Sequence, residues 1–170
     1  DEILKVMYQG KVPKTSAPSP ADLISIFKPL IDEGKSIIVI LMSSGLSSAT
    51  LEAAKRAKEK LSGDIEIIDS RQAAGGQEII ALEAARLAKA EKSKSEIVEY
   101  ITKIVPRTNS ILGILDLMYL YRGGRIGRAR ALMGSMMKVI PIVAIRDMEG
   151  IISPIGRARN VSQVNEKIVE

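Results

Sequence analysis

Short apolar runs alternate with longer amphipathic stretches through the first two thirds of the chain. Ile37 to Leu41 and Ile65 to Ile68 are short and rich in β-branched residues, which indicates buried strands. Between them, residues 48–61 place apolar side chains at helical spacing, with Lys and Glu on the opposite face. A strand, a helix and a second strand in this order predict a parallel βαβ unit.

Two helices in this part of the chain have clear start signals. Ser19 can cap the free amide groups of a helix that begins at Pro20. Ser93 and Glu96 fit the capping box, in which each side chain satisfies a backbone donor of the other residue. The four helices expected here cover residues 20–33, 48–61, 77–90 and 93–105.

The pattern changes after Pro106. Two strand candidates, residues 139–145 and 151–157, are separated by a short polar turn, which predicts an antiparallel hairpin. We therefore expect an α/β fold with a parallel sheet flanked by helices in residues 1–106, and the start of a second α/β lobe in residues 107–170. Further elements expected in the second lobe are a strand at 111–115, a short helix at 116–121 and helices at 129–138 and 161–170.

The composition narrows the possible chemistry. The 170 residues include no cysteine and no histidine, so the chain itself holds no disulfide framework, Cys/His zinc site or Ser-His-Asp triad. Acidic residues are scattered over helix surfaces, so we expect neither a metal site nor catalytic residues. The longest apolar run is too short to cross a bilayer and no signal peptide is visible, which predicts a cytoplasmic protein without a membrane span.

Positive charge is concentrated in one segment. The formal net charge is +5, and residues 122–138 contain no acid but five cations: Arg122, Arg125, Arg128, Arg130 and Lys138. Such a cluster attracts an acidic partner surface, or it is simply a solvated face. Aromatic residues make up 3% of the chain and offer few stacking platforms, so nucleic acid is not expected as a partner.

The loop after the first strand carries four serines and a glycine in residues 43–48. In a parallel sheet, ligands bind beyond the carboxyl ends of the strands, where loops meet helix N-termini. A helix start presents unpaired amide groups, serine hydroxyls add donors, and Gly45 lets the backbone approach a ligand. The loop is therefore a candidate site for a carboxylate, phosphate or sulfate. A serine cap whose spare hydroxyls face water is the structural alternative.

Three sharper motifs do not fit the chain. No Gly-Lys-Ser/Thr follows the serines, so the loop is not a P-loop. A nucleophile elbow requires a second glycine and a histidine, and both are missing. Gly123-Gly124-Arg125 lacks the third glycine of a dinucleotide fingerprint. The alternative that remains from an enzyme class is a sugar-phosphate-binding isomerase-like domain, which holds its phosphate by hydroxyls and helix amides.

Three separated segments of the chain form a distinctive set: Pro13 to Pro20 (PKTSAPSP), Ser43 to Ser47 (SSGLS) and Leu117 to Ile126 (LMYLYRGGRI). Together they resemble the DegV family of fatty-acid-binding proteins. Later landmarks are similar as well, namely Asp69-Ser70, Ile140-Pro141-Ile142, Gly150 and Arg157-Ala158-Arg159. Their order and spacing extend the resemblance over nearly the whole chain.

The resemblance implies two α/β lobes that hold one long-chain fatty acid in an apolar tunnel, with no other cofactor. Carried over to this sequence, it implies that Thr15, Ser16 and Ser47 contact the carboxylate. Ser44 and Gly45 would shape the loop. Bacterial members present the acid to a separate ATP-dependent fatty acid kinase, which forms an acyl phosphate for phospholipid metabolism. The chain would then be a carrier and not an enzyme.

The basic segment is the candidate docking surface for such a kinase, through Arg122, Arg125, Arg128 and Arg130. An unpaired guanidinium is costly to bury in an apolar tunnel, whereas on a surface it speeds the encounter with an acidic partner. Gly123 and Gly124 allow a sharp turn, so we expect Arg125 to project from the end of the short helix. In the structural alternative, Arg125 pairs with Asp116.

The chain departs from the family pattern in three ways. Ser48 and Ala49 stand where Gly-Thr is usual, which removes a threonine hydroxyl, and Ala17 stands where glutamine is common. Family members are also much longer, with an Asp-Ser-Thr strand and a His-bearing region near the head group that are not in this sequence. Four of the methionines after residue 109 either line the tunnel or fill the core: Met118, Met133, Met136 and Met137.

Overall fold

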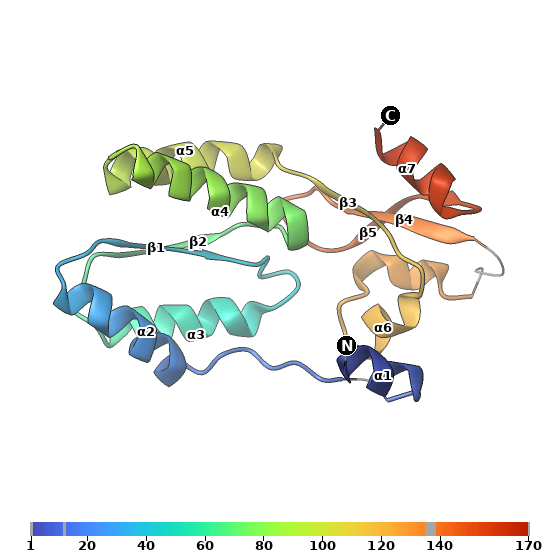
Figure 1. The fold of residues 1–170 in the computed structure, drawn as a ribbon, viewed down its shortest axis with the longest axis horizontal. Coiled ribbons are helices and arrows are strands. Elements are labelled where there is room, and N and C mark those ends of the chain that lie inside the picture. The colour runs from blue at the N-terminus through green and yellow to red at the C-terminus, as the bar shows by residue number, and fades with distance from the viewer. Residues whose placement is uncertain (1, 12, 135–138, 170) are drawn as a thin grey trace. The chain divides into compact units, whose positions relative to one another are not determined.

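The computed structural model describes residues 2–11, 13–134 and 139–169 (Figure 1). The chain forms two compact units. We call the one made of Ala17–Ser110 and Ile145–Ile151 the parallel-sheet unit. The other is the hairpin unit, made of Asp1–Ser16, Ile111–Ala144 and Ile152–Glu170. The division into domains at residues 106 and 107 stays a prediction.

The parallel-sheet unit is built around two parallel strands. β1 (Ile37–Leu41) pairs with β2 (Ile65–Asp69) in a register that sets Ile37 opposite Ile65 and Leu41 opposite Asp69. Four helices accompany the strands: α2 (Pro20–Asp32), α3 (Ser48–Glu59), α4 (Ala74–Lys89) and α5 (Lys94–Ile104). A 3₁₀-helix, η1 (Val105–Arg107), follows α5. The expected α/β fold with a parallel sheet flanked by helices is confirmed.

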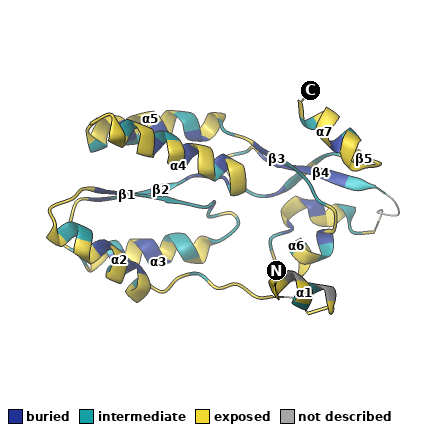
Figure 2. Ribbon diagram, viewed as in Figure 1, coloured by how far each residue is buried: buried dark blue, intermediate teal, exposed yellow. Residues whose placement is uncertain are grey.

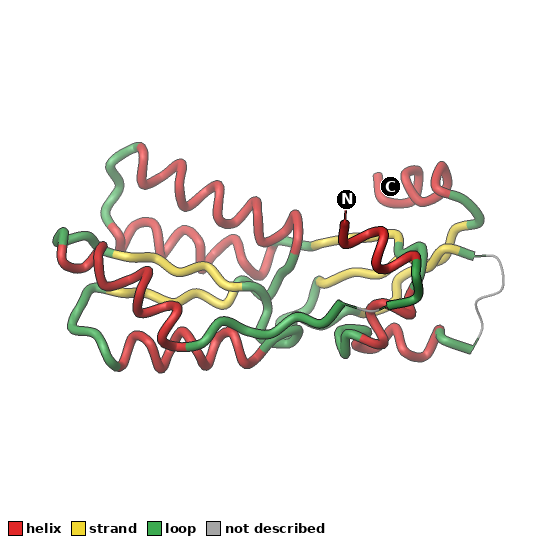
Figure 3. Tube along the Cα trace, turned by 60° about the horizontal axis from the view of Figure 1, so that its bottom comes forward, coloured by secondary structure: helices red, strands yellow, loops and turns green. Residues whose placement is uncertain are grey.

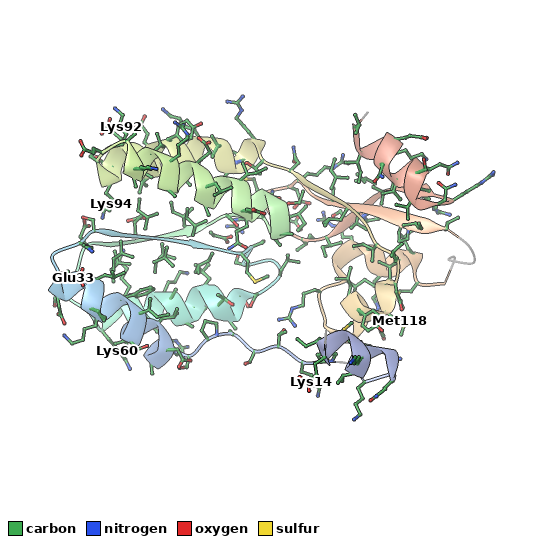
Figure 4. The ribbon with its side chains drawn as sticks, viewed as in Figure 1. Lys14, Glu33, Lys60, Lys92, Lys94 and Met118 are labelled. Carbon is green, nitrogen blue, oxygen red and sulfur yellow. The ribbon has the colours of Figure 1, made fainter. Side chains whose placement is uncertain are left out.

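Side chains on the two faces of this sheet enter different cores because successive residues of a strand point to opposite faces. Ile37 and Ile65 pack with α2 and α3, where Phe27 is among the buried residues. On the other face, Ile68 packs with α4 and α5, which contribute the fully buried Ile80 and Ile101. Figure 2 shows the outward helix faces exposed, and Figure 4 shows side chains filling both layers.

The helix starts follow the expected capping signals with one exception. The side chain of Ser19 accepts a bond from the amide of Asp22, and Ser93 and Glu96 form the expected capping box. The exception is α4, which begins at Ala74 and not at Gln77. Gly76 lies in its first turn, where a Cβ atom would collide with the hydroxyl of Ser110. This glycine therefore permits close packing and does not mark a loop.

The hairpin unit contains most of a three-stranded sheet in the order β3-β4-β5. Its strands are β3 (Ser110–Gly113), β4 (Ile140–Ile145) and β5 (Ser153–Ala158). β4 and β5 pair antiparallel, as expected, with an irregularity between Ile142 and Val143. Ile142 packs with Val164 of the last helix. The helices of the unit are α1 (Glu2–Tyr8), α6 (Leu117–Arg122), η2 (Gly127–Leu132) and α7 (Val161–Val169).

The prediction of an α-helix at residues 129–138 is wrong for residues 129–134, which are the ones that the structure describes. The structure has the 3₁₀-helix η2 there, followed by a turn at Met133 and Gly134. Gly127 adopts φ 54°, and the amide of Arg128 donates to the carbonyl of Ile152 at 2.9 Å. This tether to a distant residue replaces the regular α-helical pattern. Met136, Met137 and Lys138 lie outside the described residues.

Candidate functional site

The serine loop, residues 43–48, lies where the pattern of strands and helices predicts it, beyond the carboxyl end of β1. Because β1 and β2 are parallel, the loop that follows β2 begins at the same edge of the sheet. The two loops are joined directly, since the amide of Ser43 donates to the carbonyl of Gln72 at 2.7 Å. Residues that follow β2 therefore belong to the surroundings of the serine loop.

Ser43 anchors the loop and is fully buried. Its Oγ donates to the carbonyl oxygen of Gly150 at 2.6 Å and accepts a bond from the amide of Gly45 at 3.1 Å. Gly150 adopts φ 64° and lies in the segment between β4 and β5. This one hydroxyl thus joins the serine loop to a segment 107 residues away in the sequence.

Gly45 lies against the same distant segment. A Cβ atom at this position would collide with the carbonyl oxygen of Glu149 and would lie 2.9 Å from Cγ2 of Ile151. Any larger residue must displace the backbone of residues 149–151, because the closest atom is a backbone oxygen and a change of side-chain rotamer cannot remove the collision. Gly45 is therefore required for the close approach of the two segments.

Ser44 is held by the two residues that end and follow β2. Its amide donates to both carboxylate oxygens of Asp69, at 3.2 and 3.3 Å. Its Oγ accepts a bond from Nη1 of Arg71 at 3.2 Å. Arg71 also forms an ion pair with Asp69, with 3.3 Å between Nε and Oδ2. The hydroxyl of Ser44 is thus oriented by its bond from the guanidinium of Arg71.

Ser47 occupies the N-cap position of α3 without capping it by its side chain. Its Oγ lies 2.8 Å from Oγ1 of Thr50, and the residue is half-buried. When Thr50 donates in this pair, the Ser47 proton can be donated to a ligand. Two half-buried hydroxyls of the loop, those of Ser44 and Ser47, are therefore held in place by neighbouring side chains.

The backbone amides of the loop are not available, contrary to the expectation from a helix start. The amide of Ser44 is bonded to Asp69, and those of Leu46 and Ser47 both donate to the carbonyl of Ser43. Together with the bonds from Ser43 and Gly45, all five amides of residues 43–47 are used internally. A phosphate cradle needs several such amides to face the ligand. The geometry therefore suits a ligand held by hydroxyls.

Thr15 and Ser16 lie in the stretch of residues 13–19, which forms neither helix nor strand (Figure 3). Both residues are exposed. They belong to the hairpin unit, whereas Ser47 belongs to the parallel-sheet unit. The convergence of Thr15, Ser16 and Ser47 on one carboxylate therefore stays a prediction.

The first half of the basic segment differs from expectation at Arg125. Arg122 ends α6 and is exposed, and Gly124 makes the expected turn with φ 73°. Arg125 is half-buried and donates from Nη1 to the carbonyl of Gly123 at 2.5 Å, so it does not project from the helix end. Asp116 caps α6 through the amide of Met118 and does not pair with Arg125.

The second half of the segment presents two exposed arginines, Arg128 and Arg130. Arg128 is bound through its backbone to Ile152 and has a further interaction within the chain. The guanidinium of Arg130 lies over the ring of Tyr121, 5.4 Å from the centroid, which is a cation–π contact. Arg122 and Arg130 are thus the arginines of this segment that are best placed to meet a partner.

The hairpin unit contains a cavity of about 540 Å³. Its volume falls within the range of small-molecule sites. Asp116 and Arg159 supply polar lining, and the apolar lining comes from Leu115, Leu117, Met118, Met133, Val139 and Ile140. Of the four methionines singled out from the sequence, the structure describes Met118 and Met133, and both line this cavity together with other apolar side chains; Met118 is labelled in Figure 4.

Sequence patterns missed Asp69 and Arg71 as parts of this site, and they missed the anchoring role of Ser43 within the serine loop. A usable signal was present, because parallel strands bring Asp69, at the end of β2, next to the loop that follows β1. The described part of the chain contains no group of three or more acidic residues that could hold a metal ion. Among the described helices, none is long and apolar enough to cross a membrane.

Comparison with known proteins gives a match over the whole chain. A family model described as "uncharacterised protein, DegV family" matches residues 1–170. A DegV domain-containing protein of Caldanaerobacter subterraneus subsp. tengcongensis is 35% identical over 150 residues, which are 88% of this chain and 53% of that relative. The chain thus spans about half the length of this curated relative.

Two solved structures are similar in both fold and sequence. One is a DegV family protein from Thermus thermophilus described by its fatty acid binding, with a TM-score of 0.89 and 27% identity over 99% of this chain and 59% of that one. The other is DegV from Bacillus subtilis, a fatty acid binding protein, with a TM-score of 0.78 and 28% identity over 97% and 58%. The chain belongs to the DegV family.

Proposed function

We propose that this chain is part of a fatty-acid carrier that binds one long-chain fatty acid by its carboxylate. The family membership supports this function, since the relatives from Thermus thermophilus and Bacillus subtilis are described as fatty acid binding. In the proposal, the hydroxyls of Thr15, Ser16 and Ser47 bind the carboxylate. Gly45 shapes the loop, and Ser44 both shapes the loop and offers its hydroxyl as a further donor.

The observation that carries the proposal is the state of the serine loop. Its amides are bonded internally, while the half-buried hydroxyls of Ser44 and Ser47 are held in place by neighbouring side chains. A carboxylate has only acceptor oxygens and can be bound by two or three hydroxyl donors. A phosphate group of a sugar phosphate calls for more donors than these hydroxyls supply, so the isomerase-like alternative is less well supported.

The acyl chain would lie among apolar side chains of the hairpin unit. The cavity lined by Leu115, Met118 and Met133 supports this assignment, because methionine adapts to flexible apolar ligands. Its volume of about 540 Å³ is ample for an alkyl chain. Burial of each methylene group of the ligand would contribute about 0.8 kcal/mol, so most of the affinity would come from this part.

In the proposal the chain is a carrier and not an enzyme, and a separate fatty acid kinase phosphorylates the bound acid. The basic segment supports a docking role, because Arg122 and Arg130 present positive charge at the surface. Arg128 is exposed as well but is engaged within the chain, and Arg125 is half-buried. Docking would therefore rest mainly on Arg122 and Arg130.

Native mass spectrometry tests the carrier function directly. The intact protein, purified without added lipid, is expected to retain an extra mass in the range of a long-chain fatty acid. The same preparation, denatured before injection, is the control and should lose this mass. A protein that retains no such mass and does not take up added hexadecanoic acid would contradict the proposal. A retained sugar phosphate would favour the isomerase-like alternative.

A further inference from the structure

We infer that Arg71 is a positioning residue of the serine loop and makes the site select an ionised carboxylate; this inference rests on the proposed function. Arg71 connects the carboxyl ends of the two parallel strands. Its Nη1 donates to Oγ of Ser44 at 3.2 Å, and its Nε lies 3.3 Å from Oδ2 of Asp69. All three residues belong to the parallel-sheet unit, and we call them the Asp69–Arg71–Ser44 network.

The first consequence concerns the proton of Ser44. A guanidinium carries only donors, so Oγ of Ser44 must be the acceptor in its bond with Arg71. A hydroxyl has a single proton, which is then left to donate to a third group. A carboxylate oxygen, which only accepts, is a suitable partner. Without Arg71, the hydroxyl is free to rotate and loses this preference.

The second consequence concerns charge. The carboxylate of Asp69 is 12% exposed and lies at the edge of the sheet where an incoming carboxylate would bind. Two like charges at the same edge of the sheet repel each other, and the repulsion is strong where water is partly excluded. The guanidinium of Arg71 offsets the charge of Asp69 and, with 35% of its side chain exposed, remains accessible to a second anion.

The backbone of Arg71 is held in a conformation that non-glycine residues rarely adopt, with φ 55°. The amide of Arg71 donates to Oδ1 of Asp69 at 3.0 Å. From the other side, Gly150 approaches so closely that a Cβ atom on it would lie 3.2 Å from Cα of Arg71. Such a conformation costs energy and persists because the surroundings determine it, which is common at functional sites.

The alternative hypothesis is a purely structural role for the Asp69–Arg71 pair. Substitutions that remove the charge of one partner distinguish this hypothesis from anion selection by Arg71. If the pair only supports the loop, removing either partner weakens the binding of every ligand. If Arg71 selects an anion, Arg71→Gln weakens binding of the acid, while Asp69→Asn maintains or strengthens it. Asparagine at residue 69 keeps one oxygen that can accept from the amides of Ser44 and Arg71. It removes the negative charge and replaces the oxygen that faces Nε of Arg71 by an NH2 group.

The experiment compares hexadecanoic acid with hexadecanol in the intact protein by displacement of a fluorescent fatty acid. Arg71→Gln is expected to weaken binding of the acid about tenfold and to change binding of the alcohol less than about twofold. Arg71→Lys should recover part of the loss, because it restores the charge but not the fork of donors. Arg86→Gln is the matched control, since Arg86 pairs with Glu83 on α4.

The outcomes separate this inference from the proposed function. An unchanged preference of Arg71→Gln for the acid over the alcohol overturns the role of Arg71 while leaving the carrier function intact. A parallel loss for both ligands in Arg71→Gln and Asp69→Asn assigns the pair a structural role and overturns the inference as well. A wild-type protein that binds neither ligand overturns the proposed function and the inference together. Melting temperatures of all variants identify any that fail to fold, and Asp69→Asn still gives the sign of the charge effect.

Discussion

The serine loop and the basic segment of residues 122–130 are both polar stretches that follow a regular element, yet they are held in opposite ways. In the serine loop, the amides of residues 43–47 are bonded within the protein, and Ser43 is fully buried. In the basic segment, Arg122, Arg128 and Arg130 are exposed. The first presents a few hydroxyls at fixed positions, and the second presents charge at the surface.

This difference separates two kinds of recognition. Binding a single carboxylate requires donors within about 3 Å of its oxygens, so the loop that carries them must be rigidly supported. Attraction of an acidic protein surface acts over about 10 Å and tolerates variation in side-chain position. Substitutions at the anchors of the serine loop, Ser43 and Gly45, should therefore alter stability and ligand binding together. Those at its donor hydroxyls should alter ligand binding, and those in the basic segment should alter association alone.

The largest expected loss comes from Gly45→Ala. The added methyl group collides with the carbonyl oxygen of Glu149, so the segment 149–151 must move, and we expect a loss of about 2 to 3 kcal/mol in unfolding free energy. Gly75→Ala is the matched control, because no atom lies within 4 Å of its added Cβ. Urea unfolding measures both; equal stabilities of the two variants would contradict the packing argument.

Ser43→Ala should have the next largest effect. It leaves the carbonyl of Gly150 and the amide of Gly45 without their partner in a buried environment, at a cost of about 1 to 2 kcal/mol. Ser25→Ala is the control, since Ser25 bonds to the carbonyl of Asp22 on an exposed face of α2. Thermal unfolding measures both variants, and the melting temperature should fall in Ser43→Ala only. A similar shift in both would show that burial of Ser43 does not matter.

Charge reversal in the basic segment tests the other side of the comparison. Arg122→Glu combined with Arg130→Glu should leave fatty-acid binding unchanged and cost little stability, about 1 kcal/mol at most, from the lost cation–π contact. Acyl phosphate formation by a cognate kinase should slow severalfold, most strongly at low salt. The control reverses Arg56 and Lys60 on and after α3, both exposed. A normal rate of acyl phosphate formation at low salt would contradict the docking role and indicate that the basic segment is only a solvated face.

The smallest effect is expected at an exposed network, the capping box of α5. The side-chain bond from Lys92 and the bonds from Ser93 lower the pKa of Glu96 from 4.5 to about 2. A depressed pKa means that these bonds stabilise the fold above pH 4.5 and that their contribution disappears as the pH falls through 2. Glu96→Gln should flatten the fall in stability over this range.

Urea midpoints measured between pH 6 and pH 2 check this prediction, with Glu59→Gln, an exposed glutamate of α3, as the control. Lys92, labelled in Figure 4, lies at the turn between α4 and α5, where water reaches the pair. Screening by solvent therefore keeps the effect small. A larger acid sensitivity in Glu96→Gln than in the wild type would reverse the assigned sign.

The parts of the fold that could be predicted depend on local signals. β1 follows from one apolar run, and the starts of α2 and α5 follow from Ser19 and Ser93 and the acids three residues later. Helix α1 was not predicted, because its seven residues carry no clear capping signal. The segment 127–132 was predicted as α-helix and is 3₁₀, because contacts with Ile152 determine its backbone. Such long-range contacts leave no local pattern.

The candidate site shows the same limit. The serine loop could be located from its sequence, but the role of each serine could not. Ser43 is an anchor because it meets Gly150, and Ser44 is oriented because Arg71 reaches it from the next loop. The expectation of free amides failed for the same reason, since Asp69 takes the amide of Ser44. Composition identified hydroxyls, and tertiary contacts decided which of them remain available.

Titration of the intact protein with a fluorescent fatty acid tests the central claim, that the hydroxyls of Ser47 and Thr15 hold a carboxylate. Loss of a charge-assisted hydrogen bond costs about 1.5 to 3 kcal/mol, so Ser47→Ala and Thr15→Ala should each weaken binding about tenfold or more with little change in stability. Ser48→Ala, an exposed neighbour at the start of α3, should bind like the wild type. Unchanged affinity in both Ser47→Ala and Thr15→Ala would contradict the account.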